Sequence, residues 1–430
     1  MYITGWAVAL MALGAVPAAV SQNRNVAWLW LLGVAVLVMI DVWTAPSPEK
    51  LGAKRRVPAS VRLTESTSAR LDVVNLGKRR MRGAVRDAWQ PSAGASDTRH
   101  TFSLAGGETA TFTTRLTPTR RGDRRSVGVT IRTSGLLRLG GRQRTMPLVD
   151  TLRVLPEFKS RRHLPSRLAR LREIDGRTAV QLKGAGSEFD SLREYVIGDD
   201  VRTIDWRATA RRADVVVKTY RPERDRRVLI VLDTSRLSAG RVGDEPRLDA
   251  SIEATLLLSA LASRAGDRVQ VTAFDRSEQA RAAATTGAGL MTRLAVALAP
   301  VESRLMEPDW AAIARLARER LSQRALVVLL TQVEVSAIDS GLLEAVAALS
   351  HRHQVVVASV ADPDLDDMLQ ERGSVDALYG AAAAARTGLE NDAVGSRVRS
   401  LGADVITALP DDLAPVLADR YLALKAAGKL

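Results

Sequence analysis

The chain contains no cysteine and few aromatic residues, and both shortages limit what it can do. Without thiols it cannot form disulfide frameworks, zinc–thiolate sites, iron–sulfur clusters or a cysteine nucleophile. Aromatic residues are only 4% of the 430, so the cores must be built from alanine, valine and leucine. The hydrophobic share of 46% is ample for two or three packed domains, which excludes a globally disordered chain.

Known catalytic sequence patterns are also missing. The chain has no His-Glu-x-x-His, no Gly-x-Ser-x-Gly and no Walker phosphate loop. His351 and His353 flank an arginine but lack an obvious third metal ligand, so we expect them to be surface histidines. We therefore predict that the protein is not an enzyme and holds no catalytic cofactor.

The net charge of +14 allows three interpretations. Basic residues can keep a protein soluble, attract it to anionic lipid, or bind nucleic acid. Nucleic-acid binding normally needs a basic face with stacking aromatics or a reader helix, and the sequence offers neither. Nucleic acid is therefore not an expected partner, whereas a lipid bilayer is.

Two apolar runs open the chain, at residues 2–20 and 26–43. Each is close to the roughly 20 residues that cross the hydrocarbon core of a bilayer as a helix. Asp41 interrupts only the end of the second run, where we expect it near lipid head groups. A short polar link, residues 21–25, joins the runs, so we predict a transmembrane helical hairpin over residues 1–45. A cleavable signal peptide is the alternative, but no basic segment precedes the first run.

Basic residues near the spans predict their orientation. Lys50, Lys54, Arg55 and Arg56 follow the second run, whereas the link carries Arg24 alone. Because cytoplasmic flanks are enriched in lysine and arginine, the bulk of the chain should be cytoplasmic. The expected location is the inner or plasma membrane, as a multi-pass protein.

Residues 56–156 alternate apolar and polar residues with a period of two, which is typical of half-buried strands. Turn residues such as Gly106, Gly107, Gly140 and Gly141 separate these runs. We therefore predict an antiparallel β-sandwich domain. The expected strands are residues 68–74, 82–89, 99–104, 109–116, 126–132 and 151–155.

From residue 227 to 430 strands and helices alternate, which predicts a doubly wound, mainly parallel α/β sheet. We expect strands at residues 227–232, 268–274, 325–330, 354–360 and 405–409, and helices at residues 248–265, 310–321, 342–350 and 411–427. Ligands of such sheets bind at the carboxyl ends of the strands. The first strand ends in Asp233-Thr-Ser235, and no glycine-rich phosphate loop follows it.

The order of elements and the Asp-x-Ser turn resemble a von Willebrand factor A-type domain. In that family an Asp-x-Ser-x-Ser turn joins a distant Thr and a distant Asp to hold Mg²⁺, which prefers oxygen ligands. Asp233 and Ser235 match, but Leu237 stands at the third position and Gln332 where the distant Asp is expected. Thr285 or Thr286 could stand for the distant Thr. The resemblance implies a degenerate metal-ion-dependent adhesion site with Asp233 and Ser235 as its remaining ligands.

Residues 157–226 form a linker that alternates acids, arginines and single aromatic residues. This pattern resembles the signature of the bacterial "domain of unknown function 58" family. The residues that carry it are Glu188, Phe189, Asp190, Arg193, Tyr195, Asp199, Asp200, Arg202, Asp205, Trp206, Arg207 and Arg211. The resemblance implies a membrane-anchored protein, often encoded beside a MoxR-type AAA+ ATPase and acting as its adaptor.

The signature allows three interpretations. Its acids and arginines could form a self-satisfied network that locks the linker onto the α/β domain, with the aromatic residues as apolar anchors. They could instead form a surface that docks an ATPase or its client. Glu188 and Asp190 could also be a catalytic pair, although nearby arginines would hold both ionised.

The leading functional hypothesis is a membrane-tethered, non-enzymatic interaction protein that partners a MoxR-type ATPase. One alternative is a Mg²⁺-dependent adhesion module that binds a partner carboxylate. The other is a hydrolase whose catalytic pattern is unfamiliar.

Overall fold

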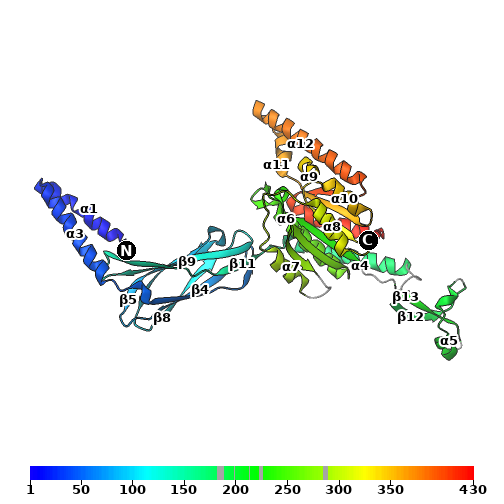
Figure 1. The fold of residues 1–430 in the computed structure, drawn as a ribbon, viewed down its shortest axis with the longest axis horizontal. Helices are drawn as coiled ribbons and strands as arrows, with labels where there is room; N and C mark the ends of the chain where they lie inside the picture. Colours follow the sequence, from blue (N-terminus) through cyan, green and yellow to red (C-terminus); the bar gives the residue numbers. More distant parts are fainter. Residues whose placement is uncertain (182–187, 198, 213, 222–225, 284–288) are drawn as a thin grey trace. The chain divides into compact units, whose positions relative to one another are not determined.

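The computed structural model describes residues 1–181, 188–197, 199–212, 214–221, 226–283 and 289–430. These residues form two compact units, 1–157 and 158–430 (Figure 1).

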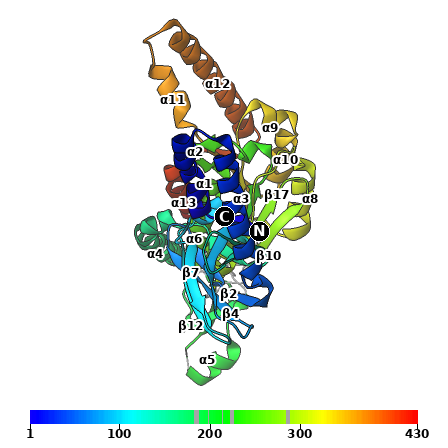
Figure 2. The ribbon, with the colours of Figure 1, turned by 90° about the vertical axis from the view of Figure 1, so that its left-hand side faces the viewer.

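The N-terminal apolar residues form three helices, and only one of them is long. The first run is divided into a short strand and two short helices: β1 (Tyr2–Ile3), α1 (Gly5–Leu13) and α2 (Ala15–Ser21). The second run forms α3 (Arg24–Thr44), which lies against α1 and α2 (Figure 2). Among the described residues one helical stretch, Arg24–Lys50, is long and apolar enough to cross a membrane. The two predicted spans are therefore supported for the second run alone.

Asp41 joins the end of α3 to the β domain. Its side chain is buried, and its carboxylate accepts three backbone hydrogen bonds, from the amides of Leu137 and Leu139 at 2.7 Å and of Gly140 at 3.0 Å. A Cβ on Gly135 would lie 2.2 Å from Asp41 Oδ1, so only glycine allows this approach. The carboxylate is therefore satisfied by a loop distant in sequence rather than left as a solvated charge at the end of the helix.

Two sheets make up the β domain (Figure 1). The smaller is antiparallel, with strand order β2-β4-β8-β6. The larger is mostly antiparallel: β1, β10, β9, β11 and β3 lie in that order, and β9 also pairs with β5, which pairs with β7. The strands are β2 (Leu51–Arg56), β3 (Ser60–Arg62), β4 (Thr67–Asn75), β5 (Met81–Trp89), β6 (Ala95–Ser96), β7 (Arg99–Leu104), β8 (Thr109–Leu116), β9 (Gly122–Ser134), β10 (Gly140–Met146) and β11 (Thr151–Leu155).

The apolar faces of the two sheets share a core in which Leu71 and Val73 of β4 pack with Val85 of β5 and Ile131 of β9. Such alternation of buried and exposed residues is what the period-two pattern predicts.

A buried ion pair also links the two sheets. Arg55 of β2 donates to Asp87 of β5, with Nη2 at 2.5 Å and Nε at 3.1 Å from Oδ1, and both side chains are fully buried. Arg55, one of the four basic residues used to predict the orientation, is thus buried and neutralised rather than exposed. Lys50, Lys54 and Arg56 are exposed and remain available for that role.

The second unit is built on a six-stranded sheet of order β18-β17-β14-β19-β20-β21. Five strands are parallel, and β18 pairs antiparallel at one edge, so the predicted mainly parallel sheet is confirmed. Its strands are β14 (Arg227–Asp233), β17 (Arg268–Phe274), β18 (Glu278–Ala283), β19 (Leu326–Leu330), β20 (Gln354–Val360) and β21 (Asp404–Ala408).

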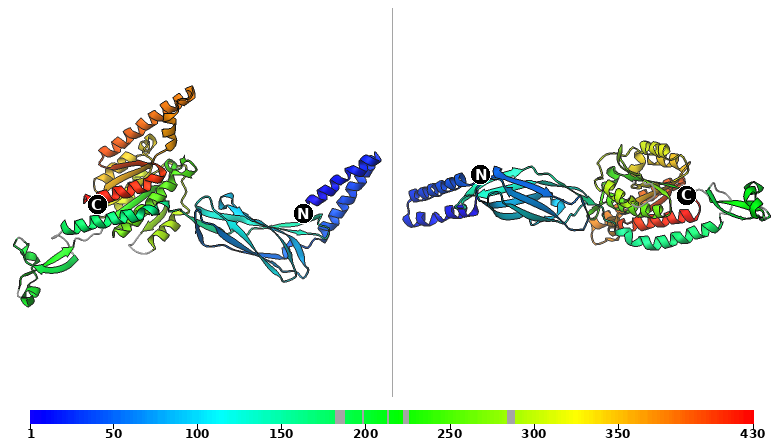
Figure 3. Two further views of the ribbon diagram at one scale, coloured as in Figure 1. Left: turned by 180° about the vertical axis from the view of Figure 1, so that it is seen from behind. Right: turned by 90° about the horizontal axis from the view of Figure 1, so that it is seen from below.

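Helices cover both faces of this sheet (Figure 3). Val228, Ile230 and Leu232 of β14 pack against one helical layer, whereas Leu229 and Val231 pack against the other. A strand buried on both sides reads as a continuous apolar run, as residues 228–232 do. Apart from a short helix in the signature segment, the α-helices described in this unit are α4 (Leu164–Gln181), α6 (Arg247–Arg264), α7 (Leu290–Leu298), α8 (Trp310–Arg320), α9 (Val335–Asp339), α10 (Leu342–Ser350), α11 (Pro363–Gln370), α12 (Val375–Ser400) and α13 (Pro410–Ala426).

Candidate functional site

Two buried aspartates meet where β14 and β17 end. Asp233 is the last residue of β14, and Asp275 directly follows β17, whose Phe274 is in register with Asp233. Both strands are parallel, so their carboxyl ends lie at the same edge of the sheet, where ligands of such folds bind. The predicted position of Asp233 is therefore correct.

Protein groups already occupy both carboxylate oxygens of Asp233. Oδ1 accepts a hydrogen bond from the backbone amide of Ser235 at 2.8 Å, and Oδ2 accepts one from the hydroxyl of Thr331 at 2.6 Å. The residue is 1% exposed. Burial raises the pKa of the Asp233 carboxyl, and the hydrogen bonds from Thr331 and Ser235 oppose that rise.

Of the other expected metal ligands, the Ser235 side chain lies beside Asp233, but the remaining positions do not supply oxygen ligands there. Ser235 Oγ accepts from the amide of Leu237 at 3.3 Å and so caps a short 3₁₀ turn. Leu237 packs into the apolar core, and the amide oxygen of Gln332 accepts from the Ser359 hydroxyl at 3.1 Å. Thr285 and Thr286 lie outside the described residues. Within the described part of the chain, no group of three or more His, Asp or Glu side chains could hold a metal ion.

Asp275 is a residue of this edge that the sequence analysis missed. Its Oδ1 accepts from the Ser277 amide at 3.1 Å and from Gln279 Nε2 at 3.0 Å. Arg304 Nη1 lies 3.8 Å from its Oδ2. The signal was available, because Asp275 directly follows a predicted strand just as Asp233 does. These contacts make Asp275 an organiser of the loop rather than an open ligand.

The two histidines that were expected at the surface differ. His351 is exposed, but His353 is buried, and burial lowers the pKa of its imidazole. The prediction for His353 was wrong because the residue directly precedes β20 and enters the interior with that strand.

The signature segment folds into a small hairpin. Its parts are β12 (Glu188–Glu194), β13 (Val216–Arg221), the 3₁₀ turn η4 (Val201–Thr203) and α5 (Trp206–Arg212). β12 and β13 pair antiparallel, and Ile204 bridges to Val217. Acidic residues alternate with other residue types in this segment because several of them lie at the ends of these short elements.

Three aspartates of the signature hold the hairpin in shape. Asp199 accepts from Arg193 Nη2 at 2.5 Å and from the Val196 amide at 3.0 Å. Asp200 accepts from the amide of Arg202 at the start of η4. The hydrogen bond from Arg193 is the main cause that lowers the pKa of Asp199, so the pair is ionised at neutral pH.

Asp205 holds the start of α5. Its Oδ1 accepts from the amides of Arg207 and Ala208, both at 3.0 Å, and its Oδ2 lies 3.3 Å from Lys218 Nζ. The backbone hydrogen bond from Ala208 lowers the pKa of Asp205. The ion pairs described for the signature segment thus join its own residues, which does not favour a network that locks onto the α/β domain.

Apolar side chains on this hairpin are left in solvent. Ile197 is 96% exposed and Trp206 69%, and Val196 and Val201 are also exposed. Trp206 was expected to be an apolar anchor, but the structure leaves it unburied. Arg202, Arg207 and Arg211 are exposed, whereas the side chains of Glu188, Phe189 and Asp190 lie outside the described residues.

One comparison gives a match to a family model. Residues 191–399 match the family model described as "Protein of unknown function DUF58". The expected resemblance is thus confirmed over the DUF58 segment, which leaves out the N-terminal helices and the β domain.

The chain is also similar to mycobacterial proteins. "Uncharacterized protein Rv1480" of Mycobacterium tuberculosis and "Uncharacterized protein Mb1516" of Mycobacterium bovis are each 28% identical over 185 residues. The match covers 42% of this chain and 57% of each relative, so the chain spans little more than half of their length.

Among solved structures, a Salmonella alpha-2-macroglobulin mutant matches with TM-score 0.20 and 17% identity, over 24% of this chain and 7% of that one. A FixG-related protein from Vibrio parahaemolyticus matches with TM-score 0.18 and 9% identity, over 24% and 96%. TM-scores this low carry no functional argument.

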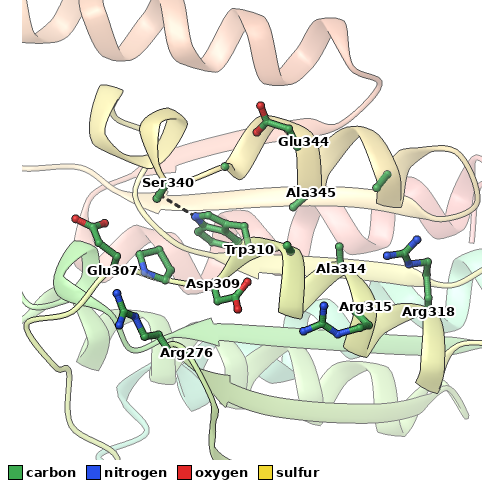
Figure 4. A pocket seen from close by; sticks show the side chains of 14 residues that line it. Arg276, Glu307, Asp309, Trp310, Ala314, Arg315, Arg318, Ser340, Glu344 and Ala345 are labelled. Atoms are coloured by element: carbon green, nitrogen blue, oxygen red, sulfur yellow. Dashed lines mark hydrogen bonds between the residues drawn. The ribbon is translucent and has the colours of Figure 1, made fainter.

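A groove of about 760 Å³ opens beside α8 in the DUF58 segment. Its floor is Trp310, whose indole N–H donates to Ser340 Oγ at 3.1 Å (Figure 4). Arg276, Arg315 and Arg318 line the groove together with Glu307 and Glu344. Glu307 also pairs with Arg236 at 2.7 Å, so its charge is partly neutralised.

We predict that Asp233→Asn leaves the melting temperature at neutral pH unchanged or higher. The folded-state pKa of Asp233 is raised, so this group destabilises the fold as pH rises from its ordinary value, about 3.9, through the raised value. An asparagine keeps the acceptor for Ser235 and can donate to Thr331, and it does not ionise. Thermal unfolding between acidic and neutral pH should therefore depend less on pH in the variant.

The control for this experiment is Thr331→Val. This change removes a donor from a buried carboxylate and should lower stability by about 1–3 kcal/mol. Titration with MgCl₂ should give the same negligible heat for wild type and Asp233→Asn. Binding heat in the wild type that Asp233→Asn abolishes would contradict the structural role and restore the adhesion-site hypothesis.

Proposed function

We propose that the protein is a membrane-tethered adaptor that docks a partner protein through the exposed side chains of its signature hairpin. The partner we propose is a MoxR-type AAA+ ATPase. In this proposal the α/β domain is a von Willebrand factor A-like module with a degenerate metal site, and the chain catalyses no reaction. The N-terminal helices anchor it as a hairpin, with the bulk of the chain in the cytoplasm.

The observation that carries the proposal is the exposure of Ile197 and Trp206 on a segment that also contains two ion pairs between its own residues. A lone exposed apolar residue is ordinary, but Val196 and Val201 accompany these two on the same small hairpin. Tryptophan is enriched among the few residues that dominate binding energy at interfaces. The cost of ordering the segment on binding is low, because capped turns already fix its backbone.

Charge supports a protein partner with an acidic surface. Arg207 and Arg211 are exposed on the same helix as Trp206. Arginine beside an aromatic residue is typical of interface centres, where its planar fork can bind carboxylates in pairs. The AAA+ partner itself is inferred from the family resemblance.

The surroundings of Asp233 support an interaction role over a metal-dependent one. Mg²⁺ takes several oxygen ligands and keeps some waters, but both oxygens of Asp233 already accept hydrogen bonds and Leu237 replaces a hydroxyl ligand. The hypothesis that Glu188 and Asp190 form a catalytic pair concerns side chains outside the described residues.

The test is affinity capture from native membranes with Trp206→Ala. We expect an AAA+ ATPase to co-purify with the wild type and to be identified by mass spectrometry. Loss of an interface tryptophan costs about 2 kcal/mol or more, so affinity should fall roughly 30-fold. The matched control is Tyr379→Ala, an exposed aromatic residue on α12, which should capture as much ATPase as the wild type.

Equal capture by all three proteins would remove the signature hairpin from the interface. Failure to recover any AAA+ subunit with the wild type would remove the proposed partner.

A further inference from the structure

The end of the β domain next to α3 has an unusual surface. The hydrogen bonds of Asp41 fix the loop of residues 135–139 against the end of that helix. A second loop, residues 76–80, lies at the same end, because the Leu76 amide donates to the carbonyl of Lys50 at 2.8 Å. The two loops are neighbours because the strands next to them pair. β5 begins after the loop of residues 76–80, β9 ends before the loop of residues 135–139, and Gly83 of β5 is in register with Thr133 of β9.

Large apolar side chains of both loops point into solvent. Leu136 is 87% exposed, and Leu76 and Leu137 are exposed as well. The backbone amide of Leu137 donates to Asp41, so the loop is held at a position where this side chain is exposed. They lie at the end where Met39 and Trp43 of α3 are also exposed. The apolar surface of the helix therefore continues onto the β domain.

Arginines and a lysine surround these leucines. All are exposed except Arg142, which is half-buried, and the described residues provide no carboxylate partner for any of them. Two arginines contact the N-terminal residues: Arg142 donates to the carbonyls of Val42 and Trp43 in α3, and the guanidinium of Arg132 lies 5.0 Å from the ring of Tyr2 in β1. The full set is Lys78, Arg79, Arg80, Arg82, Arg132, Arg138, Arg142 and Arg144.

We propose that this end of the β domain, residues 76–82 and 132–144, is a lipid-binding rim that rests on an anionic leaflet. Its leucines enter the boundary between head groups and acyl chains, and its arginines bind lipid phosphates. A bilayer surface fits this arrangement, because exposed leucines lie among cations without carboxylate partners and next to the apolar surface of α3. The inference rests on the proposed membrane anchor and adds the class of lipid that the domain recognises.

The test uses the absence of cysteine, since any introduced thiol is then a unique labelling site. The full chain is placed in lipid nanodiscs with an environment-sensitive fluorophore at Leu136→Cys, Met39→Cys or Val149→Cys. The nanodiscs carry a lipid with a nitroxide quencher on its head group. Val149 is the matched control, because it is an exposed apolar residue at the opposite end of β9 from the rim. Its neighbour Asp150 accepts a hydrogen bond from the amide of Ser126, and Ser126 lies about 26 Å along β9 from Ser134.

We expect quenching at Leu136 to be several-fold stronger than at Val149 and comparable to that at Met39. Quenching at Met39 but not at Leu136 would overturn the rim and leave the anchor in place. Absence of quenching at all three positions would overturn both.

The charge of the lipid gives the second arm. The experiment is repeated in phosphatidylcholine alone and with phosphatidylglycerol added, for the Leu136→Cys protein with and without Arg79→Glu and Arg80→Glu. The charge reversals should weaken quenching at Leu136 in the anionic nanodiscs and leave it unchanged in the neutral ones. Equal quenching in every combination would overturn the recognition of anionic lipid.

Discussion

Replacing Asp87 by alanine should destabilise the β domain by about 3–5 kcal/mol. The change leaves the guanidinium of Arg55 buried without its main counter-ion, and an uncompensated buried charge costs that much. Asp87 also accepts from the indole of Trp89 at 3.0 Å and from the hydroxyl of Thr114 at 2.9 Å. Arg55 keeps a contact with Asp150 at 3.0 Å, which keeps the cost within this range.

Thermal unfolding of the full chain in detergent, with limited proteolysis between the domains, would measure this loss. The control is the double variant Arg55→Met with Asp87→Leu, which removes both charges and should recover part of the stability, since Trp89 and Thr114 still lose their acceptor. A single Asp87→Ala variant as stable as the wild type would show that the ion pair does not hold the two sheets together.

Trp310→Ala should cost about 3–5 kcal/mol in the α/β domain, as large-to-small changes of buried aromatic residues do. Trp310 is the largest fully buried side chain, and it forms the floor of the groove beside α8. Its removal also leaves the Ser340 hydroxyl without its indole donor. Chemical denaturation followed by circular dichroism would measure the change.

Trp206→Ala is the matched control, because the same chemical change occurs at an exposed position. Its stability should stay within about 0.5 kcal/mol of the wild type, as for most surface substitutions. If Trp206→Ala destabilised the chain as much as Trp310→Ala, the signature hairpin would be part of a core rather than a docking surface.

The sequence predicted most regular elements because their patterns carry the signal of burial. Strands at residues 268–274 and 354–360 and the helix at 342–350 match the structure end to end. The long helix α12 was missed, since its many alanines and glycines show no apolar stripe and few of its residues are buried. β10 was missed because Gly-Gly-Arg-Gln-Arg has no alternation, and its pairing comes from β9.

The polar contacts of the candidate site were less predictable. The position of Asp233 follows from the end of an apolar strand, but its bond with Thr331 joins residues far apart in sequence. Burial of Arg55 and Asp41 could not be inferred either, because in sequence a charge beside an apolar run looks like a solvated flank. In both cases the partner that satisfies the charge comes from another element.

The hydrogen bonds to Asp41 also determine how a force on the β domain would act on α3. Three amides of one loop hold the last turn of α3, and β1 pairs with β10 beside it. These contacts fix the orientation of α3 relative to the β domain. In the proposed membrane anchor, a force on the β domain would therefore be transmitted to α3 and would tilt that helix.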